Sequence, residues 1–155
     1  MPILLLILAV VAVDQASKFY IQTHMTPGMS IPVINKVFHI TYVLNPGAAF
    51  GILQHRTWFF VAVAGLLFAA VAYCYRQIPA GYRLLRPGLG LLLGGAAGNV
   101  IDRLQTGFVI DFFDFRVWPV FNVADTAICV GVALIAYSIL LPQGKRDEAC
   151  DGREP

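Results

Sequence analysis

Nineteen consecutive residues without a charge, Thr57 to Tyr75, lie between Arg56 and Arg76. A helix of this length, rising about 1.5 Å per residue, matches the roughly 30 Å hydrocarbon core of a bilayer. The whole chain has the same character, because 58% of its residues are hydrophobic and only 13% are charged. Soluble domains carry about 25% charged residues. The chain is therefore predicted to be an integral membrane protein.

Three further apolar stretches extend this prediction to an all-α bundle of four transmembrane helices. The expected spans cover about residues 3–21, 57–75, 87–103 and 121–141, all within a single domain, 1–141. We expect the first span to be retained, because no Lys or Arg precedes it and no small-residue cleavage site follows it. Residues 142–155 are polar and are expected to form a tail.

The distribution of basic residues predicts the orientation of the bundle. The link between the second and third spans carries three arginines and no acid, and the tail begins with Lys145 and Arg146. Cytoplasmic loops are enriched in Lys and Arg. Both termini are therefore expected in the cytoplasm, and segments 22–56 and 104–120 are expected outside it.

One outer segment has the pattern of a strand. Between Lys36 and Leu44, apolar residues alternate with others, which places Phe38, Ile40, Tyr42 and Leu44 on one face. The Asn-Pro-Gly sequence that follows is typical of a turn. We therefore expect a small extracytoplasmic β element that rests on the membrane interface.

The polar groups of the predicted spans gather at one end of the bundle. Following the chain through the four spans brings these residues to the outer side: Asp14, Lys18, Asn99, Asp102, Arg103, Asp111, Asn122 and Asp125. An ionisable group inside a span costs about 2.5–3.5 kcal/mol on insertion scales, and such groups usually face the interior and mark a functional site. Asp14 and Lys18, four residues apart, can also pair on one helix face.

Carboxylates are the reactive groups that this cluster offers. All five acids before residue 142 are aspartates, and no Ser-His, Cys-His or HExxH arrangement lies in the spans. The three histidines are widely spaced, so we expect no metal and no cofactor. Two neighbouring aspartates cannot both ionise easily, so one keeps a proton while the other activates water. The pattern favours an aspartyl peptidase.

Five short stretches carry a resemblance to a known family. In order they are Asp14-Gln-Ala-Ser-Lys18, Asn45-Pro-Gly-Ala-Ala-Phe-Gly51, Gly94-Gly-Ala-Ala-Gly-Asn-Val-Ile-Asp-Arg103, Val109-Ile-Asp-Phe112 and Phe121-Asn-Val-Ala-Asp125. With these stretches the chain resembles lipoprotein signal peptidase (signal peptidase II), a family of bacterial inner-membrane aspartyl peptidases. One departure is that Ser17 stands where Thr is common.

The resemblance implies a role for each matching residue. Asp111 and Asp125 are implied to be the catalytic pair, one as general base and one as general acid. Asn122 would orient the Asp125 member of this pair. The groups implied to line or support the substrate site are Asn45, Asn99, Arg103, Asp14 and Lys18, the last two as stabilisers of the cluster. The segment from Lys36 to Asn45 is similar to the sheet that cradles the substrate.

The resemblance also implies a substrate and a location. The substrate would be a prolipoprotein whose cysteine already carries diacylglycerol, and the enzyme would cut just before that cysteine at the outer face of the cytoplasmic membrane. Its partners would be this substrate and membrane lipid, and it would act as a monomer. The net charge of +2 gives no reason to expect a nucleic acid.

Several simpler interpretations stay open at this point. Asp111 can be a loop residue that caps a turn. Asp125 lies at the start of a predicted helix, where an acid is stabilised by the positive end of the helix dipole. Asp102 beside Arg103 is interpreted as an interfacial ion pair, whereas Asp114 and Arg116 are interpreted as solvated link residues.

Rival functions are also open. A transporter or channel needs polar groups at mid-membrane or in both membrane halves, and the inner halves of these spans lack them. A non-catalytic scaffold would tolerate replacement of the aspartates. Another class of intramembrane aspartyl protease carries a GxGD signature, which this sequence lacks.

Overall fold

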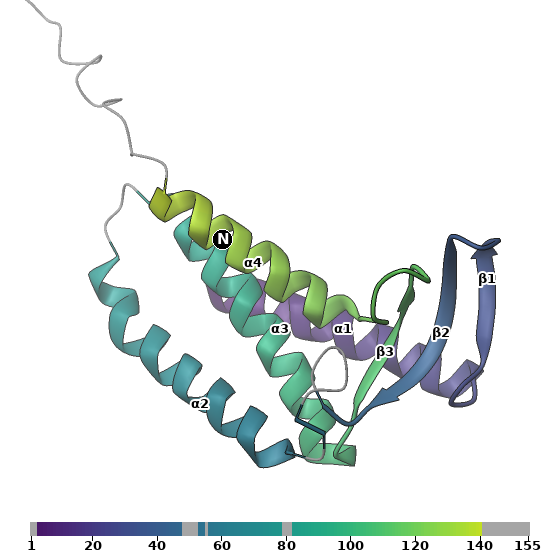
Figure 1. The fold of residues 1–155 in the computed structure, drawn as a ribbon. Helices are drawn as coiled ribbons and strands as arrows, with labels where there is room; N and C mark the ends of the chain where they lie inside the picture. The colour runs from purple at the N-terminus through teal and green to yellow at the C-terminus, as the bar shows by residue number, and fades with distance from the viewer. Residues whose placement is uncertain (1–2, 48–52, 55, 79–81, 141–155) are drawn as a thin grey trace, which may run out of the picture.

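The computed structural model describes residues 3–47, 53–54, 56–78 and 82–140. A bundle of helices carries a small sheet at one end, as Figure 1 shows. In chain order the elements are α1 (Ile3–His24), β1 (Ser30–Ile34), β2 (Phe38–Asn45), α2 (Thr57–Cys74), the short 3₁₀ helix η2 (Tyr75–Gln77), α3 (Leu85–Thr106), β3 (Val109–Asp114) and α4 (Val123–Leu140).

Three segments of the described chain are long and apolar enough to cross a membrane: Ile3–His24, Thr57–Gln77 and Val123–Leu140. Their surfaces carry large apolar side chains that water would solvate poorly, since Leu66 is 71% exposed and Phe19 is 67% exposed. The buried residues of α1 include Asp14 and Lys18. Apolar groups face outward and charges face inward, as expected for a protein in lipid.

Helix α3 is the central helix of the bundle and packs on α1, α2 and α4 (Figure 1). Its glycines make these contacts possible. Gly94 lies against Val10 of α1, and a Cβ atom at Gly95 would overlap the carbonyl oxygen of Ala124 in α4. Small residues let transmembrane helices approach backbone to backbone. Because its glycines and polar residues lower its hydropathy, α3 is not among the three strongly apolar segments.

The sheet has the order β1-β2-β3, and both strand pairs are antiparallel. The predicted strand is present as β2, and Gly47 N–H donates to Asn45 Oδ1 in the turn after it. Strands β1 and β3 were not predicted. The expected alternation is interrupted by an irregularity between Ile40 and Val43. Tyr42 is buried whereas Leu44 is 37% exposed, so β2 is covered unevenly along its length.

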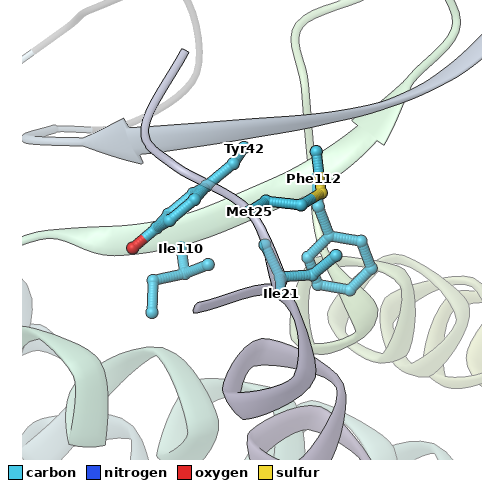
Figure 2. Close-up of a cluster of buried hydrophobic side chains, with 5 residues drawn as sticks. All are labelled: Ile21, Met25, Tyr42, Ile110 and Phe112. Carbon is cyan, nitrogen blue, oxygen red and sulfur yellow. The ribbon is translucent and has the colours of Figure 1, made fainter. Parts of the chain in front are cut away.

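The inner face of the sheet covers the end of α1. Figure 2 shows the five buried side chains that join them: Ile21 from α1, Met25 directly after α1, Tyr42 from β2, and Ile110 and Phe112 from β3. This cluster lies directly beside the polar residues of α1, because Ile21 is one turn beyond Lys18. It therefore fixes β3 at the end of the bundle where the charged groups collect.

Candidate active site

Asp111 lies in the middle of β3 and is only 2% exposed. Its strand begins directly after α3, which Gly107 ends in a left-handed conformation (φ 80°) that glycine adopts without strain. Two amide side chains hold the carboxylate. Asn122 Nδ2 donates to Oδ1 over 2.7 Å, and Asn45 Nδ2 donates to Oδ2 over 2.9 Å. The end of β2 and the start of α4 thus meet at this carboxylate.

Asp125 lies in the first turn of α4, where it forms a reciprocal cap with Asn122. The Asp125 N–H donates to Asn122 Oδ1 over 2.8 Å, and the Asn122 N–H donates to Asp125 Oδ2 over 3.2 Å. This exchange satisfies backbone groups that every helix start leaves without partners. The other carboxylate oxygen accepts from Asn99 Nδ2 over 2.8 Å. Asn122 therefore contacts both aspartates.

The two aspartates also line one cavity of about 680 Å³. Burial, followed by the negative charge of Asp125, raises the pKa of Asp111 to about 7, although the bonds from Asn45 and Asn122 act in the opposite direction. A carboxylic acid with this pKa keeps its proton at neutral pH about half of the time. The arrangement can hold one proton between two carboxylates.

Lys18 connects the helices behind this pair. Its ammonium group lies 2.8 Å from Asp14 Oδ2 and 2.9 Å from Asp102 Oδ2, and it donates to Asn99 Oδ1 over 3.0 Å. All three charged side chains are at most 3% exposed. Asn99 in turn donates from its Nδ2 to Asp125 Oδ1, so its side chain links Lys18 to Asp125. The predicted pairing of Asp14 with Lys18 is confirmed, and the pair belongs to a larger buried network.

The prediction for Asp102 was wrong. It is buried and paired with Lys18, rather than forming an interfacial pair with Arg103. Its Oδ2 also accepts the backbone N–H of Ile110 over 3.1 Å, and Asp14 Oδ1 accepts that of Ala124 over 2.9 Å. These two N–H groups belong to the residues that directly precede Asp111 and Asp125. The ion network therefore holds the backbone beside both aspartates.

Gln15 is a member of the network that the motif analysis did not single out. Its Nε2 donates to Asp102 Oδ1 over 2.8 Å and to Asp14 Oδ2 over 3.2 Å, so it bridges the two acids. The available signal was its position between Asp14 and Lys18 in the first of the five motif stretches. Its helical position does not predict the bridge, which needs α3 to lie alongside α1.

Arg103 lines the same cavity. Its Nη2 donates to the carbonyl oxygen of Gly47 over 3.0 Å, and its Nη1 donates to that of Asn99 over 3.4 Å. Its Cζ atom lies 4.3 Å from the centre of the Phe60 ring on α2. The guanidinium charge interacts with both Asp125 and Asp111. Phe60 was not predicted as a site residue, and nothing in the sequence near it would have indicated one.

Asp114 lies outside the cavity lining, and its interpretation as a solvated residue was wrong. It is 5% exposed, and its Oδ2 accepts from Thr41 over 2.7 Å and pairs with Arg116 at 2.9 Å. Although burial acts to raise it, the bonds from Thr41 and Arg116 hold the pKa of Asp114 below its usual value. Asp114 joins β3 to β2 and to the loop that follows.

The deeper part of the cavity is apolar and lies between α2, α3 and α4. Its walls include Val63 and Leu67 of α2, Leu92 of α3 and Ile128 of α4. The cavity thus combines an acidic end with an apolar channel along the helices. This arrangement fits a hydrophobic substrate segment whose reactive bond lies beside two carboxyl groups.

Comparison with known proteins identifies the family. Residues 6–141 match the family described as signal peptidase (SPase) II. The chain belongs to the signal peptidase II family. It is therefore a member of a family of aspartic peptidases, and the resemblance seen in its motifs is confirmed.

Curated relatives and solved structures agree with this membership. A lipoprotein signal peptidase of Moorella thermoacetica is 52% identical over 155 residues, which is the full length of both chains. One of Bacillus subtilis is 41% identical over 143 residues, covering 90% of this chain and 93% of its own. A bacterial membrane enzyme solved at 2.3 Å superposes with a TM-score of 0.82 at 33% identity, over 99% of this chain and 92% of that chain.

Proposed function

We propose that Asp111 and Asp125 are the catalytic pair with which this signal peptidase II removes signal peptides from prolipoproteins. The observation that carries the proposal is the placement of Asn122, which donates from its side chain to the Asp111 carboxyl group and from its backbone N–H to the Asp125 carboxyl group where the two line one cavity. Asn45, Asn99 and Asn122 hold the carboxyl oxygens, whereas Asp14 and Lys18 support the site from behind.

The electrostatics of the pair suggest how the two roles are divided. Asp111, whose pKa is raised to about 7, holds the proton. Asp125 accepts hydrogen bonds from Asn99 and from the Asn122 N–H, and these favour a carboxylate. Asp125 therefore takes a proton from the attacking water. Asp111 gives its proton to the leaving amine as the carbon–nitrogen bond breaks.

The proposed substrate is a precursor that carries diacylglycerol on the cysteine after the cleaved bond. The apolar walls of the cavity provide a surface for acyl chains and for the hydrophobic signal peptide. Arg103, which lies at the acidic end, would hold a carbonyl oxygen of the substrate near the bond to be cut. The substrate segment would thus lie along the helices with its cysteine near Asp111.

For the membrane topology, we propose four spans, with α3 as the fourth helix that crosses the bilayer. Its flanks are covered by α1 and α4, so it needs fewer lipid-facing apolar side chains than the other three. Both termini would lie in the cytoplasm, residues 142–155 would form a tail, and segments 22–56 and 104–120 would lie on the outer side of the bacterial inner membrane. The protein would work there as a monomer.

A cleavage assay with the purified protein tests the proposal. A precursor with a diacylglyceryl-modified cysteine should be cut just before that cysteine, whereas the same precursor without the lipid should be cut far more slowly. Equal cleavage of both forms would show that the lipid is not recognised. Cleavage at another bond would contradict the proposed position of the substrate.

A further inference from the structure

Helix α2 has few connections to the rest of the bundle near the active site. It packs mainly on α3, and Figure 1 shows it set apart from α4. Of its residues, only Ala64 is buried. Near its start, Thr57 Oγ1 donates to the Gly107 carbonyl oxygen over a long 3.4 Å. A second connection in this region is the contact between Phe60 and Arg103.

Arg103, which lines the cavity, is held from three sides. The Gly47 carbonyl follows β2, the Asn99 carbonyl belongs to the preceding turn of α3, and the Phe60 ring belongs to α2. The two carbonyl oxygens bond to separate nitrogens of the guanidinium, so they restrict its position. At 4.3 Å, the Phe60 ring covers the guanidinium within the distance of a cation–π contact.

We propose that Phe60 is a positioning residue that holds the Arg103 guanidinium beside the two aspartates through its aromatic face. This inference rests on the proposed function, because it assigns Arg103 a role at the bond that is cut. Without the ring, the long Arg103 side chain can turn toward the carboxylates or out of the cavity. Either movement removes its charge from the place where the substrate carbonyl gains electron density.

The main competing explanation is that Phe60 only fills space in the cavity wall. The two explanations predict different orders in a series of substitutions. Aromatic residues attract a cation through the ring face, in the order Trp, Tyr and Phe, whereas Leu and Met fill space without that face. A packing role would tolerate Leu and Met better than the larger Trp.

The experiment measures kcat and KM for cleavage of the lipidated precursor by Phe60→Leu, Phe60→Met, Phe60→Tyr and Phe60→Trp, together with the thermal midpoint of each variant. Phe68→Leu is the matched control. It makes the same change on the same helix, two turns away, at a half-buried side chain that does not line the cavity.

We expect Phe60→Leu and Phe60→Met to lower kcat between about 2-fold and 30-fold, the range of a cation–π contact converted to a rate. Phe60→Tyr and Phe60→Trp should keep most of the activity, and Phe68→Leu should resemble the wild type. The inference is overturned if Leu and Met match the wild type, if activity follows side-chain volume alone, or if only KM or the thermal midpoint changes.

The proposed function fails in a different way. If Asp111→Asn and Asp125→Asn kept their turnover, the catalytic pair itself would be wrong. If those variants are inactive and Phe60→Leu cleaves like the wild type, only the role of Phe60 is lost.

Discussion

Asn122 Nδ2 lies 2.7 Å from Asp111 Oδ1, although the two residues belong to different elements, one at the start of α4 and the other in β3. The same asparagine caps α4 through the backbone of Asp125. One side chain therefore sets the position of Asp111 and of the helix start that carries Asp125. This relationship joins the fold to the chemistry of the site.

Replacing either aspartate of the pair should abolish cleavage. Asp111→Asn and Asp125→Asn each keep the shape of the side chain but remove its ability to exchange a proton. General acid–base groups contribute about 100-fold to 10,000-fold, so turnover of a lipidated precursor should fall at least that far. Asp114→Asn is the control, because Asp114 is bonded to Thr41 and Arg116 outside the cavity. An Asp114→Asn variant that is inactive while its thermal midpoint matches the wild type would mean that the wrong acids were chosen.

The pH profile of the enzyme should depend on Asn45. Its amide stabilises the ionised form of Asp111, so Asn45→Ala should raise the pKa of Asp111 further above about 7. A general acid works only while protonated, so activity falls as the pH rises through its pKa. In the plot of kcat against pH, the fall in activity on the alkaline side (the alkaline limb) should therefore move to higher pH.

The other charges that act on Asp111 are those of Asp125, Lys18 and Arg103, and all three stay in place in this variant. Asp114→Asn should leave the limb where it is. A limb that stays fixed, or moves to lower pH, in Asn45→Ala would argue against Asp111 as the proton donor.

Loss of Lys18 should destabilise the whole bundle. Lys18→Met leaves Asp14 and Asp102 buried without a cation, and breaking a buried ion pair costs about 3–5 kcal/mol. We expect a lower thermal midpoint in detergent and a large loss of activity. Adding Asp102→Asn should recover part of the stability, because it removes one uncompensated charge.

Lys36→Met is the control for this prediction, because Lys36 is exposed between β1 and β2. If Lys18→Met were as stable as this control, the buried network would not support the fold.

The close contact between α3 and α4 should depend on Gly95. In Gly95→Ala the new Cβ atom would overlap the carbonyl oxygen of Ala124, which is helix backbone and has little room to move. Overpacking of this kind costs about 1–3 kcal/mol or more, and it would shift the start of α4 with Asp125. We expect Gly95→Ala to have a lower thermal midpoint and a lower cleavage rate than the wild type.

Gly65→Ala on α2 is the matched control, since no atom lies within 4 Å of its added Cβ. It should change the stability by no more than about 1 kcal/mol, in the direction of greater helix propensity. Equal behaviour of the two variants would show that the helices can separate at Gly95 without cost.

Much of this protein can be predicted from local patterns in its sequence. The apolar stretch after Arg56 predicts a membrane helix because its length and hydropathy are properties of one segment alone. The alternation before Asn45 predicts β2, and the short motifs indicated the family. The grouping of Asp14, Lys18 and Asp125 at one end followed from counting the spans.

Only the packing of the chain decided which side chains meet. Asp102 and Arg103 are neighbours in sequence, yet Asp102 turns to Lys18 and Arg103 turns to Phe60 and Gly47. Helix periodicity assigns a face to each residue, but it does not say which neighbour covers that face. That choice depends on how closely the glycines of α3 let α1 and α4 approach, a property of several distant segments together.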